Sequence, residues 1–393
     1  MTDCLEPLAD DFSPSADFDL PSRPEHKALS SVDWDFPNRI AHSEIEGVHP
    51  YPAKFVAELP RAVLECLPVQ PGTAVLDPFC GSGTTLVESQ RRGFRSVGID
   101  LNPIACLMSR VKVSTAPETL EEAARKVLSA ADSVRDPEIP AIPNLDHWFR
   151  KDIQARLACL TEAIATAAPE ARDILRLALS SIIVRVSNQE SDTRYAAIAK
   201  NTTADEVFPM FSRAVDRLAY VLHSRTYALS PSTVIEADTL QVNAADVGEP
   251  VGLVITSPPY PNAYEYWLYH KYRMWWLGFD PIAVKEKEIG ARAHFFKKNH
   301  HTADHFVDQM RKTFALLEQV VVPGGYACFV VGRSRIHGKI VDNAKIIENA
   351  GLATGFVPVF LKDRVLSANR KSFNLSHANI KKETVLVLRR DAA

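Results

Sequence analysis

Short apolar runs alternate with a helical pattern early in the chain. A helix is indicated at 56–67, and the run TAVLDPF at 73–79 has the length and composition of a buried strand. The segment at 84–93 repeats apolar residues at helical spacing and stops at Gly93, and the run at 96–103 predicts a second strand. Strand, helix and strand in close succession predict a βαβ unit and therefore a parallel sheet.

The pattern from about residue 117 to residue 228 is helical. Its segments carry apolar residues every three or four positions, which is the spacing of one helix face. The region is longer than a connection between neighbouring parallel strands requires. We therefore predict a helical insertion at 117–228, with its main helices in 121–134, 156–168, 172–189 and 208–225.

Strands resume after the helical region. The run at 251–259 ends in two prolines, which cannot continue a hydrogen-bonded ladder. The runs at 352–361 and 382–390 predict a closing antiparallel pair. The chain is thus predicted to be an α/β protein with an open, mostly parallel sheet that one helical insertion interrupts. The other elements predicted here are a strand at 232–238, a helix near 303–320, a strand after Pro323-Gly324-Gly325 and a helix at 339–351.

Composition and charge give weaker information. The chain is 46% hydrophobic and 24% charged, and its formal net charge of −3 provides no overall positive field for a nucleic acid. The charge is uneven, however. Seven acids and one arginine among the first 25 residues predict a disordered acidic tail, which we place at 1–35. The segment 362–390 holds eight lysines and arginines against two acids.

The sequence indicates a cytoplasmic protein with no membrane partner. Its six cysteines form no CxxC pair, which suits a reducing compartment and argues against a disulfide scaffold or a zinc ribbon. The acidic start differs from a signal or transit peptide, and no apolar run is long enough to span a bilayer. We expect no metal, because His300, His301 and His305 lack partners at ligand spacing and indicate a solvated basic loop.

The segment LDPFCGSGTTL at 76–86 carries the first chemical signal. It places Asp77 at a strand end, followed by two glycines and a helix start, where the backbone can approach a ligand closely. Asp100 ends the next strand, where an acid can accept hydrogen bonds from a ribose diol. A dinucleotide-binding fingerprint would need a glycine where Leu86 stands, and Asp77 would repel a pyrophosphate. The pattern therefore favours a loop that binds a ligand with an amine and a sulfonium. The alternative, a plain strand–helix turn without a ligand, is less favoured.

The segment VITSPPYPNAYEYW at 254–267 carries the second signal. Ser257 Oγ and the carbonyl of Pro258, held rigid by Pro259, can both accept hydrogen bonds beyond the end of this strand. The alternative is a proline turn that merely caps a strand.

Three segments together resemble a known enzyme family. DPFCGSGTT with GIDLNP resembles motifs I and II of the S-adenosylmethionine-dependent methyltransferases. TSPPY resembles motif IV of the amino-methyltransferases, which methylate exocyclic nitrogens of adenine or cytosine. HPYPAKF at 49–55 resembles their motif X, but it ends in Phe55 where the family has proline. The resemblance covers roughly 35–113 and 232–390 and implies a class I methyltransferase (Rossmann-like) fold with S-adenosylmethionine as cofactor.

The resemblance also implies residue roles and domain limits. The catalytic domain would comprise 36–116 and 229–393. The implied catalytic residues are Ser257, Pro258, Pro259 and Tyr260. Ser257 Oγ and the Pro258 carbonyl would accept hydrogen bonds from the exocyclic amine of the base and free its lone pair for attack, without a metal or a covalent intermediate. Tyr260 would stack on a base that has been flipped out of its helix. The implied cofactor-binding residues are Tyr51, Lys54, Asp77, Phe79, Cys80, Gly81, Ser82, Gly83, Thr84, Asp100, Leu101, Asn102 and Asp238.

Double-stranded DNA with its target base flipped out is the substrate that the resemblance implies. Serine at the first position of motif IV is commoner among cytosine-N4 enzymes, so N4 of cytosine is favoured over N6 of adenine. Methylation of an RNA base and non-catalytic binding of nucleic acid stay as alternatives. A second copy of the chain and a cognate restriction nuclease are partners that the resemblance leaves open.

Two regions are candidates for recognising DNA. One is the helical insertion. The other is the basic loop at 362–382, since lysine and arginine neutralise phosphates and arginine and asparagine can read base edges. Its predicted DNA-binding residues are Arg364, Arg370, Lys371, Lys381 and Lys382.

Three further features have less specific interpretations. The aromatic residues between 264 and 276 could line a base pocket, but most of them are expected to form the core of a helix. Cys80 is expected to pack within the loop rather than to act as a nucleophile. The polar stretch at 187–201 is either a substrate-facing loop or a plain connector.

Overall fold

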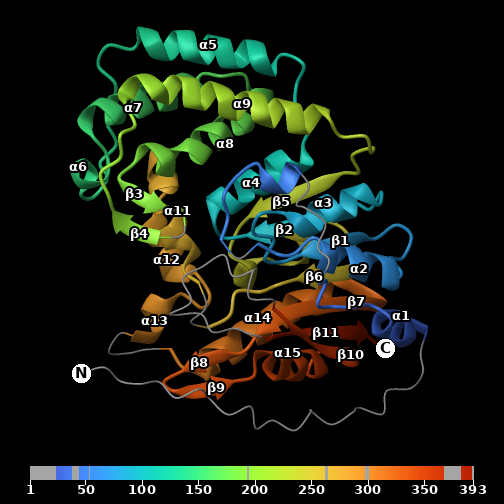
Figure 1. Cartoon of the computed structure of the whole chain (residues 1–393). Coiled ribbons are helices and arrows are strands. Elements are labelled where there is room, and N and C mark those ends of the chain that lie inside the picture. Colours follow the sequence, from blue (N-terminus) through green and yellow to red (C-terminus); the bar gives the residue numbers. More distant parts are fainter. Residues whose placement is uncertain are drawn as a thin grey trace.

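Seven strands form one sheet in the order β10-β11-β7-β6-β1-β2-β5 (Figure 1). The computed structural model describes residues 24–37, 44–52, 54–192, 194–261, 264–296, 301–366 and 382–391. Strands from β5 to β7 are parallel to their neighbours, whereas β11 is antiparallel to both β7 and β10. The predicted mostly parallel sheet with a closing antiparallel pair is confirmed. The strands are β1 (Ala74–Asp77), β2 (Ser96–Asp100), β5 (Ser232–Glu236), β6 (Val251–Thr256), β7 (Val321–Gly332), β10 (Phe356–Val365) and β11 (Lys382–Arg390).

Alternate side chains of the central strands face opposite layers of helices. Val75 of β1 and Leu253 of β6 share a hydrophobic core with α1 and α2, whereas Leu76 and Val254 share one with α10, α14 and α15. Both faces of these strands are therefore buried, which explains their continuous apolar runs. The helices concerned are α1 (Pro24–Ser30), α2 (Glu58–Cys66), α10 (Ala244–Val247), α14 (Ala303–Val320) and α15 (Asn343–Leu352).

The predicted helices of the region 117–228 are present and gather beyond the β5 side of the sheet (Figure 1). Their buried side chains share one hydrophobic core with α3, α4 and α11, so the region packs onto the sheet through these helices. The rings of Phe149 and Trp276 meet at 5.5 Å in this core. The helices are α3 (Thr84–Arg91), α4 (Pro103–Val113), α5 (Leu120–Ser133), α6 (Leu145–Trp148), α7 (Lys151–Ala165), α8 (Pro169–Val186), η2 (Ala204–Glu206), α9 (Val207–His223) and α11 (Tyr266–Trp276).

The polar stretch at 187–201 forms a short hairpin that packs against α11. Arg273 of α11 is buried and forms an ion pair with Asp192 in the turn of the hairpin. The hydroxyl groups of Tyr195 and Tyr272 are 2.7 Å apart, which joins the hairpin to the same helix. The two strands of the hairpin are β3 (Gln189–Ser191) and β4 (Arg194–Ala197).

The structure differs from the sequence-based prediction after β6 and after β7. The segment predicted as a helix at 339–351 begins as a strand, and the helix starts only after Asp342, whose side chain accepts a hydrogen bond from Lys345 N at 3.1 Å. Short helices between α11 and α14 were not predicted. The additional elements are α12 (Pro281–Lys287), α13 (Arg292–Phe296), β8 (Ser334–Ile336), β9 (Lys339–Val341), η1 (Glu44–Gly47) and η3 (Thr239–Gln241).

Two predictions fall largely on residues outside the described ranges. They are the acidic tail at 1–35 and the basic loop at 362–382. The tail prediction is wrong where the structure describes it, because residues 24–30 form α1 and Trp34 is buried, with 3% of its surface exposed. No helix within the described ranges is both long enough and apolar enough to cross a membrane.

Candidate active site

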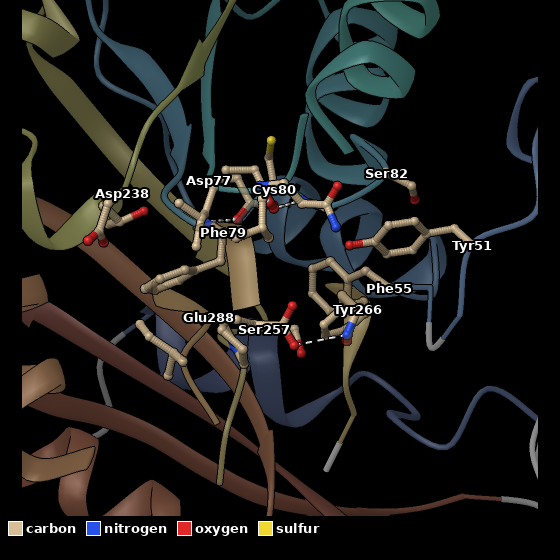
Figure 2. Close-up of a pocket in the computed structure, with 18 of the residues that line it drawn as sticks. Tyr51, Phe55, Asp77, Phe79, Cys80, Ser82, Asp238, Ser257, Tyr266 and Glu288 are labelled. Atoms are coloured by element: carbon tan, nitrogen blue, oxygen red, sulfur yellow. Dashed lines mark hydrogen bonds between the residues drawn. The ribbon is translucent and has the colours of Figure 1, made fainter. Parts of the chain in front are cut away.

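A cavity lies at the sheet edge where β1, β2 and β6 end (Figure 2). Ligands of open α/β sheets bind at this edge, because the loops that follow the parallel strands meet there. Most of the predicted site residues line it. The lining comprises Tyr51, Phe55, Asp77, Phe79, Cys80, Gly81, Ser82, Thr84, Asp100, Leu101, Asn102, Asp238, Thr239, Ser257, Pro259, Tyr266, Val284, Lys287, Glu288 and Ile289.

Asp77 joins the two strands that carry the sequence motifs. It ends β1, and its Oδ1 accepts a hydrogen bond of 2.7 Å from Thr256 Oγ1 at the end of β6. The same oxygen accepts a weaker bond of 3.2 Å from Phe79 N. Burial raises the pKa of Asp77 to about 6, although these hydrogen bonds favour its ionised form. A cationic ligand in the cavity would stabilise the ionised carboxylate further.

Asp100 fixes the glycine-containing loop from the end of β2. Its Oδ2 accepts a hydrogen bond from Gly81 N at 2.8 Å, and its Oδ1 accepts one from Asn102 N at 2.8 Å. Burial raises the pKa of Asp100 to about 6. Beside it, Asn102 Nδ2 is buried and has no hydrogen-bond partner in the part of the chain that the structure describes. The cavity thus presents a carboxylate and an amide donor side by side, which suits a ligand that both donates and accepts, such as a nucleoside.

The loop after β1 is held from behind by α4. Ser109 Oγ donates to the Gly81 carbonyl at 2.9 Å, and Lys112 Nζ donates to the Ser82 carbonyl at 2.7 Å. Lys112 is fully buried, and its burial lowers its pKa to about 7. Gly83 has φ of +78° and, unlike Gly81, is not among the residues that line the cavity. A Cβ at this position would lie 2.7 Å from Ser109 Oγ. The glycine is therefore required by the close approach of α4.

Gly83→Ala is expected to destabilise the protein by about 2–4 kcal/mol, from a left-handed backbone and a clash with Ser109. The matched control is Gly93→Ala, because Gly93 has φ of +77° but an added Cβ would meet nothing within 4 Å. The control should cost only the backbone strain, about 1 kcal/mol. Chemical denaturation of both variants measures the difference, and equal losses would contradict the packing role of Gly83.

The residues after β6 divide between the cavity and the core. Ser257 and Pro259 line the cavity, as predicted, while Pro258 is buried beneath them. Tyr260 does not line it: its side chain is 9% exposed and belongs to the hydrophobic core with α14 and β7. A Cβ on Gly290 would lie 2.5 Å from the Tyr260 carbonyl, which shows how closely the 289–291 segment covers this residue. The ring of Tyr260 is thus packed rather than presented to a base in this structure.

The segment that resembles motif X contributes an aromatic wall. Tyr51 stacks on Tyr266 at 5.5 Å and on His270 at 5.2 Å, both from α11. Lys54 points elsewhere, because its Nζ donates to the carbonyls of Glu46 and His49 and it does not line the cavity. Lys54 is thus not among the lining residues, and its hydrogen bonds hold the backbone that carries Tyr51.

Several lining residues were missed by sequence analysis. Lys287 ends α12 and Glu288 follows it, far along the chain from motif I. Only the acidic and basic run KEKE at 285–288 marks them in the sequence, and such a run usually indicates a solvated surface. With them, the described lining residues include four carboxylates (Asp77, Asp100, Asp238 and Glu288) and one lysine. This balance favours a cationic ligand over a pyrophosphate.

The predicted DNA-binding residues are only partly described. Arg370, Lys371 and Lys381 lie outside the described residues, whereas Lys382 is exposed at the start of β11. The position of Arg364 does not fit its predicted contact with DNA. Its side chain is fully buried and pairs at 3.0 Å with Glu383, its direct cross-strand neighbour, so its charge is held within the protein.

Comparison with known proteins gives matches to DNA methyltransferases. The family model N6_N4_Mtase, described as DNA methylase, matches residues 13–110. Type II methyltransferase M.MjaII of Methanocaldococcus jannaschii is 38% identical over 96 residues, which are 23% of this chain and 18% of that protein. Type II methyltransferase M.MvaI of Kocuria varians is 25% identical over 242 residues, which are 55% of this chain and 53% of that protein. These matches support an amino-methyltransferase family for the chain, and the predicted family is confirmed.

The matches leave part of each relative uncovered. The chain spans about half the length of M.MvaI and 18% of M.MjaII. Among solved structures, the rRNA methyltransferase aviRa from Streptomyces viridochromogenes is 12% identical with a TM-score of 0.36, over 90% of this chain and 94% of that one. A geranyl diphosphate methyltransferase in complex with sinefungin is 10% identical with a TM-score of 0.33, over 85% of this chain and 76% of that one.

Proposed function

We propose that the protein transfers the methyl group of S-adenosylmethionine to an exocyclic amino nitrogen of a base in DNA, with N4 of cytosine as the favoured target. The observation that carries this proposal is the joining of two sites in one cavity. Asp77 and Asp100 with the glycine-containing loop form the cofactor side, and Ser257 after β6 forms the target side. The hydrogen bond between Thr256 and Asp77 ties the two sides together at 2.7 Å.

The residues present fit this cofactor. Asp100 can accept from the ribose hydroxyls, and the unpartnered Asn102 Nδ2 can donate to an oxygen or nitrogen of the nucleoside. Asp77 and the other cavity carboxylates suit its positive charges. Tyr51, Phe55 and Tyr266 supply apolar surface on the opposite side (Figure 2). The bound cofactor supplies an electrophilic methyl group on a sulfonium.

Ser257 and Pro258 would act on the amine of the base. The lone pair of an exocyclic amine is conjugated into the ring, so the nitrogen attacks poorly. Acceptors aimed at both of its N–H groups favour a pyramidal nitrogen with a free lone pair, and they are already oriented before the reaction. Thr256 is fully buried and anchored to Asp77, which fixes the backbone just before Ser257.

The ends of the basic loop at 362–382 support a contact with DNA near this cavity. Glu383 at the start of β11 pairs with Gly332 at the end of β7, and β7 is parallel to β6 with Phe329 beside Thr256. Both ends of the loop therefore lie at the sheet edge that carries Ser257. Exposed Lys382 at one of these ends supports a contact with phosphates, while the helical insertion is the other candidate for recognition.

Analysis of product nucleosides tests the proposal. The protein is incubated with unmethylated DNA and S-adenosylmethionine carrying a labelled methyl group, and the digested DNA is separated by mass spectrometry. We expect label in N4-methylcytosine. Label only in N6-methyladenine would reject the cytosine assignment and retain the site. Label in RNA but not in DNA would favour the RNA alternative, and no transfer to either would reject the enzyme.

The affinity for S-adenosylmethionine is expected to fall as the pH drops through about 6. Burial raises the pKa of both Asp77 and Asp100 to about 6, so each carboxyl takes up a proton below that pH. The cationic cofactor binds better to the ionised carboxylates, so protonation opposes binding. Calorimetry from about pH 5 to pH 8 should show weak binding at the acid end and a steep gain in affinity around pH 6. An affinity that stays constant over this range would contradict the proposed contacts.

A further inference from the structure

Glu288 is a buried carboxylate that none of the recognised motifs contains. It follows α12 and lines the cavity, with 8% of its surface exposed. Its Oε1 accepts a hydrogen bond from Tyr266 N at 2.9 Å and its Oε2 accepts one from Trp267 N at 2.7 Å, at the start of α11. Figure 2 draws Glu288 beside Ser257 and Tyr266, below Asp77 and Cys80.

The proposed reaction releases a proton that these residues must accommodate. The amine nitrogen forms a bond to the methyl carbon while the bond from sulfur to that carbon breaks, and the electron pair of the broken bond stays on sulfur. The sulfonium becomes a neutral thioether, and the positive charge passes to the methylated nitrogen, which then loses one proton. The hydroxyl of Ser257 and the carbonyl of Pro258 can accept hydrogen bonds, but neither is basic enough to keep that proton.

We propose that Glu288 takes up the proton that the target amine loses during methyl transfer, an inference that rests on the proposed function. Its carboxylate lies in the same cavity as Ser257, and within the described ranges each of its oxygens accepts one backbone hydrogen bond. A carboxylate oxygen has a second lone pair, so each can also accept a proton from the cavity, directly or through one water.

The other carboxylates of the cavity are less suitable. Asp77 is bound to Thr256 at the strand end, and Asp100 is bound to Gly81 and Asn102 on the nucleoside side. Asp238 caps η3 through Leu240 N at 3.0 Å and is drawn across the cavity from Ser257 and Tyr266 (Figure 2). Glu288 is the carboxylate that α11 holds beside the target side.

The surroundings of Glu288 favour proton uptake near neutral pH. Burial, with the nearby charges of Glu265 and Asp100, raises the pKa of Glu288 to about 8, and the two amides of α11 oppose this shift. Tyr51 and Tyr266 face it from the aromatic wall, and both have pKa values raised by burial, so they remain neutral. The positive sulfonium favours ionised Glu288, so its pKa in the cofactor complex is expected below about 8.

The test compares single-turnover methyl transfer by the wild type, Glu288→Gln and a matched control. The control is Glu265→Gln, because Glu265 also accepts a backbone hydrogen bond beside α11, from Ala293 N at 3.2 Å, but does not line the cavity. We expect the wild-type rate to rise with pH and to level off below about pH 8. Glu288→Gln should lose about 10²-fold or more of the plateau rate and also the pH-dependent rise, with S-adenosylmethionine affinity within about threefold. Glu265→Gln should keep the plateau rate and the pH-dependent rise, with the rise moved to lower pH because the charge of Glu265 raises the pKa of Glu288.

Each other outcome has a distinct meaning. A wild-type rate that is independent of pH overturns the role of Glu288, and this measurement does not depend on the folding of any variant. A Glu288→Gln protein with the wild-type rate overturns it as well. Loss of rate with an unchanged pH profile and weaker cofactor binding would show that Glu288 only caps α11. A wild type that transfers no methyl group overturns the proposed function itself.

Discussion

Ser257→Ala is expected to lower the rate of methyl transfer by about 10²- to 10³-fold and to leave S-adenosylmethionine affinity within about twofold. Ser257 lines the cavity directly after the buried end of β6, on the target side. The lost hydroxyl would accept a hydrogen bond from the reacting amine. This hydrogen bond stabilises the pyramidal nitrogen of the transition state, so its loss slows methyl transfer. Rapid-quench measurement of one turnover gives the rate, and calorimetry gives the affinity.

Two comparison variants separate this role from a structural one. Thr256→Val, one residue earlier, removes the hydroxyl that donates to Asp77 at 2.7 Å, so it should weaken cofactor binding more than it slows transfer. Ser257→Asp keeps an acceptor at the target side and should recover part of the rate that alanine loses. If Ser257→Ala lost cofactor affinity in step with its rate, the serine would be a structural part of the cofactor site.

The parts of the site that could be predicted from the sequence are those in which a chemically distinctive residue stands at the end of a buried strand. Asp77, Asp100 and Ser257 all follow buried apolar runs directly, so their places at one sheet edge follow from a parallel sheet. Motifs I and IV are each a continuous stretch of sequence, so each can be compared directly with the motif of a known family. The fold followed from the same periodicity, including the antiparallel pair of β10 and β11.

The residues that were missed or misplaced depend on contacts between distant segments. Glu288 reaches the cavity only because α11 and α12 fold back over it, and nothing in the spacing of the sequence encodes that approach. Arg364 looked like a phosphate ligand by composition, but the register of β10 and β11 places it opposite Glu383. The direction of the Tyr260 side chain could not be predicted from the sequence either, because a ring next to Pro259 can face either the cavity or the core.

Asp100→Ala is expected to weaken S-adenosylmethionine binding by about 1.5–3 kcal/mol, or roughly 10- to 150-fold, because the lost acceptor is charged. The carboxylate also holds Gly81 N and Asn102 N at 2.8 Å each, so its removal loosens the loop as well as the ribose contact. Burial raises the pKa of Asp100 to about 6, so folding carries a cost for the ionised carboxylate at neutral pH, and its removal should leave the protein folded.

The matched control for Asp100 is Glu236→Ala. Glu236 stands beside Asp100 in the register of β2 and β5, and it forms an ion pair at 3.6 Å with Arg110, but it does not line the cavity. Removing it takes one negative charge from the same sheet edge without taking an acceptor from the cofactor, so we expect a loss of affinity below about threefold. Calorimetry on both variants, with thermal unfolding to check their fold, measures the difference. Equal losses would show that Asp100 acts through its charge alone, and an unchanged affinity in folded Asp100→Ala would remove it from the cofactor site.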